Sequence, residues 1–260
     1  MRFINSYHNH TARCHHAGGE DEEYVRAAIE AGYKTFGFAD HAPHLYKNGY
    51  VSSVRMLPSE LEGYVCSIRA LREKYKSDID IYAGLELEYF PALFDDDMEL
   101  YRAAGIEYVA LAQHSVGNES IEERIDSFKL TSDADVLVAY VDQCIKGIRT
   151  GRFSFMAHPD VLHYVGDDSF YVKECRRLIN AAAEEGMPLE LNMLGMATDR
   201  YYPVPLFWRT VSEMGAAVII GADAHSPGRV FSQNEVDAAL AFADKYKLNL
   251  KQDIELRRII

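Results

Sequence analysis

The feature that most constrains the fold is a regular alternation of short β-rich runs with longer segments of helical periodicity. In each repeat the β-rich run precedes the helical segment, and no linker-like stretch interrupts the series. This order predicts parallel strands joined by helical crossovers. The predicted strands cover residues 3–7, 35–39, 79–87, 108–112, 154–157, 188–192 and 217–220, and the predicted helices lie near 20–32, 58–76, 95–104, 133–150, 168–186, 203–214 and 232–246.

The repeat count bears on the architecture of this α/β chain. A parallel sheet with helical crossovers is either an open, doubly wound sheet or a closed barrel, and seven units favour the barrel. A length of 260 residues with no composition shift along it predicts a single domain over residues 1–260.

Composition and charge exclude several classes of protein. There are 27 basic and 40 acidic residues, giving a formal charge of −13, which disfavours extended nucleic-acid binding and requires a local positive site for any anionic substrate. The four cysteines form no CxxC pair, which argues against a disulfide scaffold or thiolate zinc site and favours a reducing compartment. Neither a signal peptide nor a membrane span is evident, so a cytoplasmic protein is expected.

Imidazole and carboxylate side chains gather where the predicted strands end. Because parallel strands bring their carboxyl ends together, these side chains should converge in space. Imidazole and carboxylate without thiolate favour zinc, manganese or iron, and the number of candidates exceeds what one ion needs, which indicates two or three ions. The candidates are His8 and His10 (HNH), Asp40 and His41 (ADH), Glu86 and Glu88 (GLELE), His114 (AQH), His158 (AHPD), and Asp223 and His225 (GADAH).

The ordered succession HNH, CHHAGG, FADHAP, GLELE, QHS, AHPD and GADAHSP resembles the PHP (polymerase and histidinol phosphatase) metallophosphoesterases, specifically their histidinol-phosphate phosphatase branch. The resemblance runs from about residue 3 to residue 231. It implies a distorted (β/α)7 TIM-like barrel with a trinuclear centre of divalent transition-metal ions (Zn, Mn or Fe) at the carboxyl-terminal ends of the strands.

The resemblance also assigns ligands to positions in this chain. His16 matches the ligand of the loop that follows the opening HxH, with His15 as its competing neighbour and the nearby Cys14 ranked below both. The implied ligands are His8, His10, His16, His41, Glu86, His114, His158, Asp223 and His225. In the family's grouping, one ion takes His8, His10, Glu86 and Asp223, a second takes Glu86, His114 and His158, and a third takes His16, His41 and His225.

Several neighbouring residues have two readings. Asp40 and Asp160 could orient ligand imidazoles by accepting their second N–H, and Glu88 could add a ligand or only a hydrogen bond. His44 is a candidate proton donor to the substrate or, alternatively, a loop histidine that faces water.

The substrate arginine is a departure from the family pattern. Histidinol phosphatases of this branch place an arginine shortly after the ELN motif, but Leu194 and Ala197 occupy those positions here. Arg200, helped by Arg229, is the predicted phosphate contact.

Phosphomonoester hydrolysis of a small substrate, with histidinol phosphate first, is the predicted function. The candidate catalytic residues are Glu86, Asp223 and His225. Three alternatives stay open: a PHP phosphoesterase acting on another phosphate ester or nucleotide, an amidohydrolase-type metal hydrolase, and a non-catalytic metal-stabilised module. Association into a homo-oligomer is compatible with the sequence.

Overall fold

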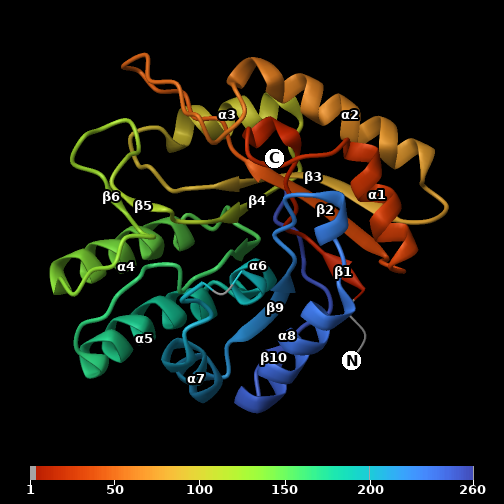
Figure 1. The fold of residues 1–260 in the computed structure, drawn as a ribbon. Helices are drawn as coiled ribbons and strands as arrows, with labels where there is room; N and C mark the ends of the chain where they lie inside the picture. The colour runs from red at the N-terminus through yellow and green to blue at the C-terminus, as the bar shows by residue number, and fades with distance from the viewer. Residues whose placement is uncertain (1–3, 199, 260) are drawn as a thin grey trace.

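A parallel sheet organises the molecule (Figure 1). The computed structural model describes residues 4–198 and 200–259. Within these residues the sheet has eight strands in the order β1-β2-β3-β4-β7-β8-β9-β10, and every neighbouring pair is parallel. The strands are β1 (Asn5–Ser6), β2 (Thr35–His41), β3 (Asp80–Leu87), β4 (Tyr108–Leu111), β7 (Phe155–Met156), β8 (Leu189–Asn192), β9 (Ala217–Gly221) and β10 (Asn249–Leu250).

The sheet curls so that its first strand meets β9 at the carboxyl end. Beyond β1, Asn9 forms a parallel bridge with Ala224, the His10 N–H donates to the Ala224 carbonyl at 2.9 Å, and the Asp223 N–H donates to the His8 carbonyl at 2.9 Å. The predicted α/β, barrel-like fold with seven consecutive parallel strands is therefore confirmed. The sequence did not predict β10 or the antiparallel hairpin of β5 (Ser115–Val116) and β6 (Ile125–Asp126).

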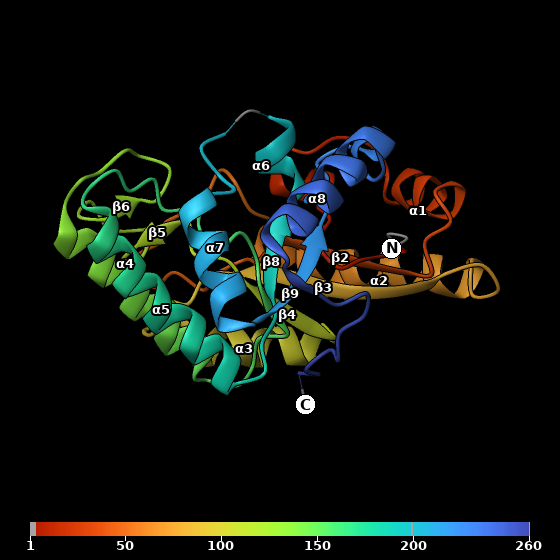
Figure 2. The same cartoon turned by 90° about the horizontal axis from the view of Figure 1, so that it is seen from below.

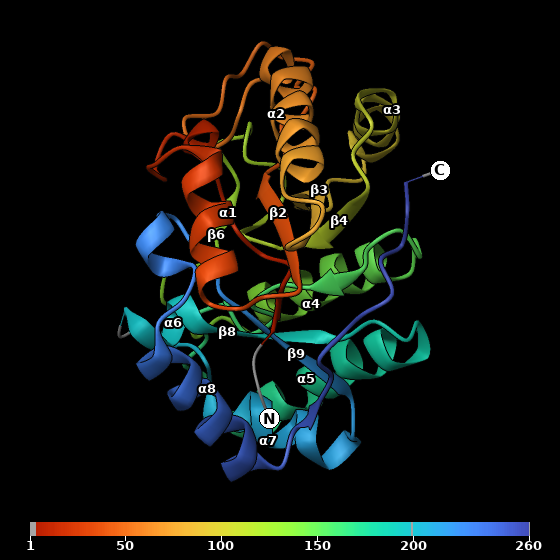
Figure 3. The ribbon, with the colours of Figure 1, turned by 90° about the vertical axis from the view of Figure 1, so that its right-hand side faces the viewer.

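The helices lie on the outside of the curled sheet (Figure 3). Figure 2 shows α4, α5 and α7 side by side. The seven long helices occupy the predicted regions, and the short α6 was not predicted. They are α1 (Asp21–Glu30), α2 (Leu61–Lys74), α3 (Phe94–Ala104), α4 (Ala134–Ile148), α5 (Asp168–Glu184), α6 (Met193–Ala197), α7 (Pro205–Met214) and α8 (Gln233–Tyr246), with short 3-10 turns at η1 (Ala12–Cys14), η2 (Pro58–Glu60) and η3 (Pro227–Arg229).

Local sequence explains where several helices begin and end. The Asp133 side chain accepts the Asp135 N–H at the start of α4, and the Asp167 side chain accepts the Phe170 N–H at the start of α5. Gly105 follows α3 in the left-handed conformation that ends many helices. In the described residues no helix is both long and apolar enough to cross a membrane.

Side chains fill the inside of the curled sheet. The Tyr108 hydroxyl lies 2.7 Å from the Tyr7 carbonyl and 3.0 Å from the Phe38 carbonyl. A Cβ at Gly37 or Gly84 would overlap the Tyr108 side chain, so these two glycines create the space that it occupies. The interior around Tyr108 is therefore a packed core, and a pocket lies beyond the carboxyl ends of the strands.

Candidate metal centre

The nine predicted ligands lie together at the carboxyl ends of the strands. His41 and Glu86 belong to β2 and β3 themselves, and the others follow β1, η1, β4, β7 and β9. This arrangement follows from the parallel topology, because each crossover begins at the same edge of the sheet.

The Glu86 carboxylate occupies the middle of the cluster. Its Oε1 lies 2.8 Å from His158 Nε2, 3.3 Å from His8 Nε2 and 3.5 Å from His114 Nε2, and its Oε2 lies 2.8 Å from His41 Nδ1. Burial raises the pKa of Glu86, but the His41, His114 and His8 rings more than offset this and hold it well below its usual range. The carboxylate is therefore ionised and faces four imidazoles.

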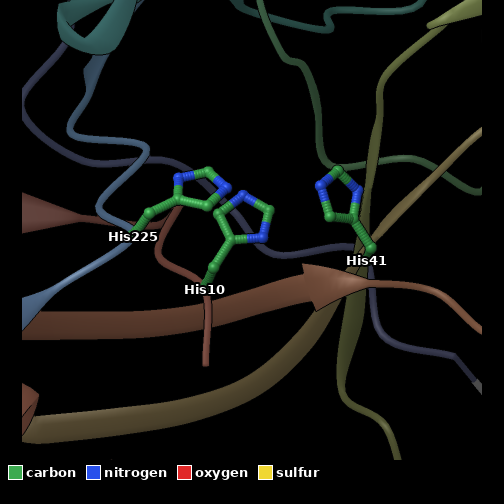
Figure 4. A group of neighbouring side chains, drawn as sticks. All are labelled: His10, His41 and His225. Carbon is green, nitrogen blue, oxygen red and sulfur yellow. The ribbon is translucent and has the colours of Figure 1, made fainter. Parts of the chain in front are cut away.

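A second group of rings includes His10, His41 and His225, which Figure 4 shows close together. The His10 and His225 rings stack with centroids 4.0 Å apart, and the His41 ring centroid is 4.5 Å from that of His10. His225 Nε2 is 3.1 Å from His16 Nε2. Burial lowers the pKa of His41 to about 4 and that of His225 to about 3, so both rings are neutral near pH 7 and offer lone pairs.

These residues fit divalent transition-metal ions. Buried Glu86 Oε2 and Asp223 Oδ1 have no hydrogen-bond partner within the described residues, although His10 Nε2 approaches Asp223 Oδ1 to 3.0 Å. Close approach without hydrogen-bond geometry is expected of atoms that share an ion. Ligand atoms lie within 4.8 Å of one another in the sets His10, His41 and His225; His8, His10 and Asp223; and His8, Glu86 and His158.

Cys14 also lies against the cluster. Its side chain is fully buried and falls within 4.8 Å of ligand atoms of His16 and His225. His16 is fixed by the same turn, because its Nδ1 lies 2.8 Å from the Cys14 carbonyl oxygen. His15 lies in the left-handed conformation beside them, at φ 66°.

Carboxylates behind the cluster contact the outer nitrogens of three rings. Glu190 Oε1 lies 2.9 Å from His8 Nδ1, Asp40 Oδ1 lies 3.4 Å from His10 Nδ1, and Glu88 Oε1 lies 3.2 Å from His114 Nδ1. Such contacts orient imidazole ligands and select their tautomers. Glu190, the second residue of β8, was not predicted from the sequence.

Two residues near the cluster, Asp160 and His44, have partners that differ from those predicted. Asp160 does not orient His158, because its Oδ2 accepts the Val204 N–H at 2.6 Å and the Trp208 Nε1–H at 2.9 Å. His44 neither faces water nor lines the pocket described below: it is 3% exposed, and its Nδ1 lies 2.6 Å from Asp97 Oδ2.

Arg229 is likewise directed elsewhere. Its Nη1 lies 3.3 Å from Glu235 Oε1 at the start of α8, and it does not line the pocket described next.

A pocket of about 770 Å³ opens above the cluster. Arg200 lines it, with Nη1 donating to the Tyr202 hydroxyl at 3.1 Å and its guanidinium 5.5 Å from the Phe128 ring centroid. Five residues that were not predicted from the sequence also line the pocket: Arg55, Glu119, Arg124, Asp126 and Phe128.

Several known proteins are similar to this chain along most of its length. A probable histidinol-phosphatase of Deinococcus radiodurans is 26% identical over 230 residues, covering 86% of each chain. The histidinol-phosphatase of Bacillus subtilis is 23% identical over 252 residues, covering 86% of this chain and 94% of the relative. A crystal structure of histidinol phosphate phosphatase from Lactococcus lactis, complexed with zinc, L-histidinol and phosphate, is 17% identical with a TM-score of 0.73 and covers 97% of this chain and 99% of the other.

The sequence profile of the PHP domain matches residues 6–194, which is well over half of the chain. This match includes seven of the nine clustered residues, from His8 to His158. The chain belongs to the PHP domain family.

Proposed function

We propose that this protein is a metal-dependent phosphomonoesterase of the histidinol-phosphatase type. The observation that carries the proposal is the convergence of nine imidazole and carboxylate side chains, the ionised Glu86 among them, at the floor of a substrate-sized pocket. The relatives support the same activity, since those from D. radiodurans and B. subtilis bear histidinol-phosphatase names.

Within this proposal the cluster binds three divalent ions of zinc, manganese or iron. The first would be held by His8, His10, Glu86 and Asp223, the second by Glu86, His114 and His158, and the third by His16, His41 and His225. Bound ions would neutralise phosphate charge and supply an activated water for in-line attack at phosphorus. Glu86 and Asp223 are suited to hold them because both stay ionised: burial raises the pKa of Asp223, but His8 and His10 hold it well below its usual range.

Arg200 is the residue proposed to hold the phosphate from the protein side. It lies on the pocket lining above the cluster, whereas Arg229 is paired with Glu235. Its planar guanidinium can donate two parallel hydrogen bonds to phosphate oxygens. The adjacent Phe128 ring stacks on His114, at 13° between planes, and offers an apolar wall to the rest of the substrate.

The test compares kcat/KM for histidinol phosphate and a generic aryl phosphate in the wild type, Arg200→Ala and Arg152→Ala. Arg152 is an exposed arginine outside the pocket lining and serves as the matched control. Loss of a charged hydrogen bond costs about 1.5–3 kcal/mol, roughly ten- to a hundredfold in binding. We expect the wild type and Arg152→Ala to prefer histidinol phosphate by more than about tenfold, and Arg200→Ala to lose about ten- to a hundredfold in kcat/KM on both esters, because both carry the phosphate. Equal rates on both esters in all three proteins would contradict the histidinol assignment.

A further inference from the structure

Arg55 is a buried cation beside the pocket that no part of the proposed chemistry uses. It comes from the long segment between β2 and η2 and is 2% exposed. Its Nη1 donates to the Ala42 carbonyl at 3.2 Å. Burying a guanidinium is costly unless nearby carboxylates compensate for its lost hydration, so its hydrogen-bond partners indicate its role.

Two carboxylates surround this guanidinium. Arg55 Nε donates to Glu119 Oε1 at 2.8 Å and Nη2 donates to Glu119 Oε2 at 3.0 Å, while Nη2 also donates to Glu88 Oε2. Glu119 is in turn bound by the Tyr46 hydroxyl. Both oxygens of Glu119 and one oxygen of Glu88 are therefore occupied.

The remaining Glu88 oxygen faces the cluster of predicted metal ligands. Glu88 Oε1 lies 3.2 Å from His114 Nδ1, and the opposite ring nitrogen, Nε2, lies 3.5 Å from Glu86 Oε1. Glu86 in β3 thus faces one edge of the His114 ring, and Glu88, the residue directly after β3, faces the other. Fixing Glu88 fixes which nitrogen of His114 carries the proton.

We propose that Arg55 is a positioning residue for His114: by holding Glu88 Oε2, it directs Oε1 to the Nδ1–H of His114 and leaves the Nε2 lone pair facing Glu86 and the pocket. Arg55 touches neither ring itself, and its effect on His114 passes through Glu88. The expected effect on metal binding rests on the proposed function. The expected effect on the hydrogen bonding of the His114 ring does not.

A purely structural alternative is that Arg55 only ties its loop to the segment that carries Glu119. The two roles separate because Glu119 contacts Arg55 without contacting His114. If tethering were the only role, Glu119→Gln and Arg55 variants would lower stability alike and leave the His114 tautomer unchanged.

The experiment is ¹⁵N NMR of the histidine rings in metal-free protein at a pH where His114 is neutral, with the His114 signal identified by its loss in His114→Asn. The variants are Glu88→Met, Arg55→Met, Glu119→Gln and the double variant Arg55→Met/Glu119→Gln. The double variant removes a cation and an anion together and so guards against misfolding. Arg72→Met removes an ion pair with Glu107 and is the control.

We expect the Nδ1–H tautomer of His114 in the wild type, Glu119→Gln and Arg72→Met, and a shift toward the Nε2–H tautomer in the other variants. Zinc affinity, measured by competition calorimetry, should fall about ten- to a hundredfold at one site in the same variants. A wild-type tautomer in folded Arg55→Met/Glu119→Gln would overturn the inference. Failure of the wild type to bind zinc would instead contradict the proposed function, and the tautomer measurement would still decide the role of Arg55.

Discussion

His8 Nδ1 lies 2.9 Å from Glu190 Oε1 and 3.1 Å from Glu190 Oε2, and both side chains are fully buried. The contact leaves His8 Nε2 directed at Glu86, 3.3 Å away. Gly221 on the neighbouring strand makes room for it, because a Cβ there would overlap the Glu190 carboxylate. Glu190 therefore holds His8 in place from the side of the ligand cluster that is opposite the pocket.

Removing the Glu190 carboxylate should weaken metal binding. We expect Glu190→Ala to lower zinc affinity about ten- to a hundredfold, the usual range for residues that orient histidine ligands. Glu190→Gln should lose less, since its amide oxygen can still accept the Nδ1–H. Competition calorimetry measures both. Wild-type zinc affinity in Glu190→Ala would show that the contact has no orienting role.

Removing Glu86 should have a larger effect than removing any supporting residue. It contacts four rings, so we expect Glu86→Ala to lower kcat by more than about 100-fold, beyond the usual range for an orienting residue. Phosphate release at saturating metal is the measurement, with the exposed Glu184→Ala as control. Near wild-type turnover in Glu86→Ala would make Glu88 the candidate for the central carboxylate.

Much of the fold and the cluster could be predicted because both depend on periodic signals. Seven parallel strands alternate with helices, and strand ends place His8, Glu86 and Asp223 together whatever the details of packing. Two-residue strands such as β10 carry no periodicity, and their pairing depends on tertiary contacts. The partners of His44 and Asp160 could not be predicted, because a place beside a motif fixes the position of the backbone but not where the side chain points.

Asp160 should affect stability rather than metal binding. Asp160→Ala leaves the Val204 N–H and the Trp208 Nε1–H without their acceptor, which we expect to cost about 1–3 kcal/mol for each buried group. Asp160→Asn keeps an oxygen for both donors. Urea denaturation of the two variants should therefore give a clearly lower free energy of unfolding for the alanine variant, and equal values would contradict this role.

The Asp160 carboxyl group should also make the stability of the protein depend on pH. Burial raises the pKa of Asp160 to about 6, above the value of 3.8 expected when unfolded. Between these values the folded state binds more protons, so this group's contribution to stability falls as pH rises from about 4 to 6. Asparagine does not titrate, so the stability of Asp160→Asn relative to wild type should rise by up to about 3 kcal/mol across that window and stay level above it. A difference independent of pH would contradict the raised pKa.

A substitution at Gly84 tests whether the inside of the curled sheet is packed. A Cβ at this position would overlap the Tyr108 ring, so Gly84→Ala should destabilise the protein by about 1–3 kcal/mol. Gly63 in α2 is the matched control, because a Cβ there meets nothing within 4 Å and alanine favours helix. Gly63→Ala should stabilise by about 0.5–1 kcal/mol. Thermal unfolding of both variants should show shifts of opposite sign, and an unchanged Tm in Gly84→Ala would contradict the packing described.

The most direct test of the central claim follows bound metal and phosphate release in one preparation, before chelation, after chelation and after reloading with zinc, manganese or iron. We expect two to three ions per chain together with phosphatase activity, loss of both on chelation, and recovery of both on reloading. Less than one ion per chain with no uptake on reloading, or phosphate release that persists in metal-free protein, would contradict it.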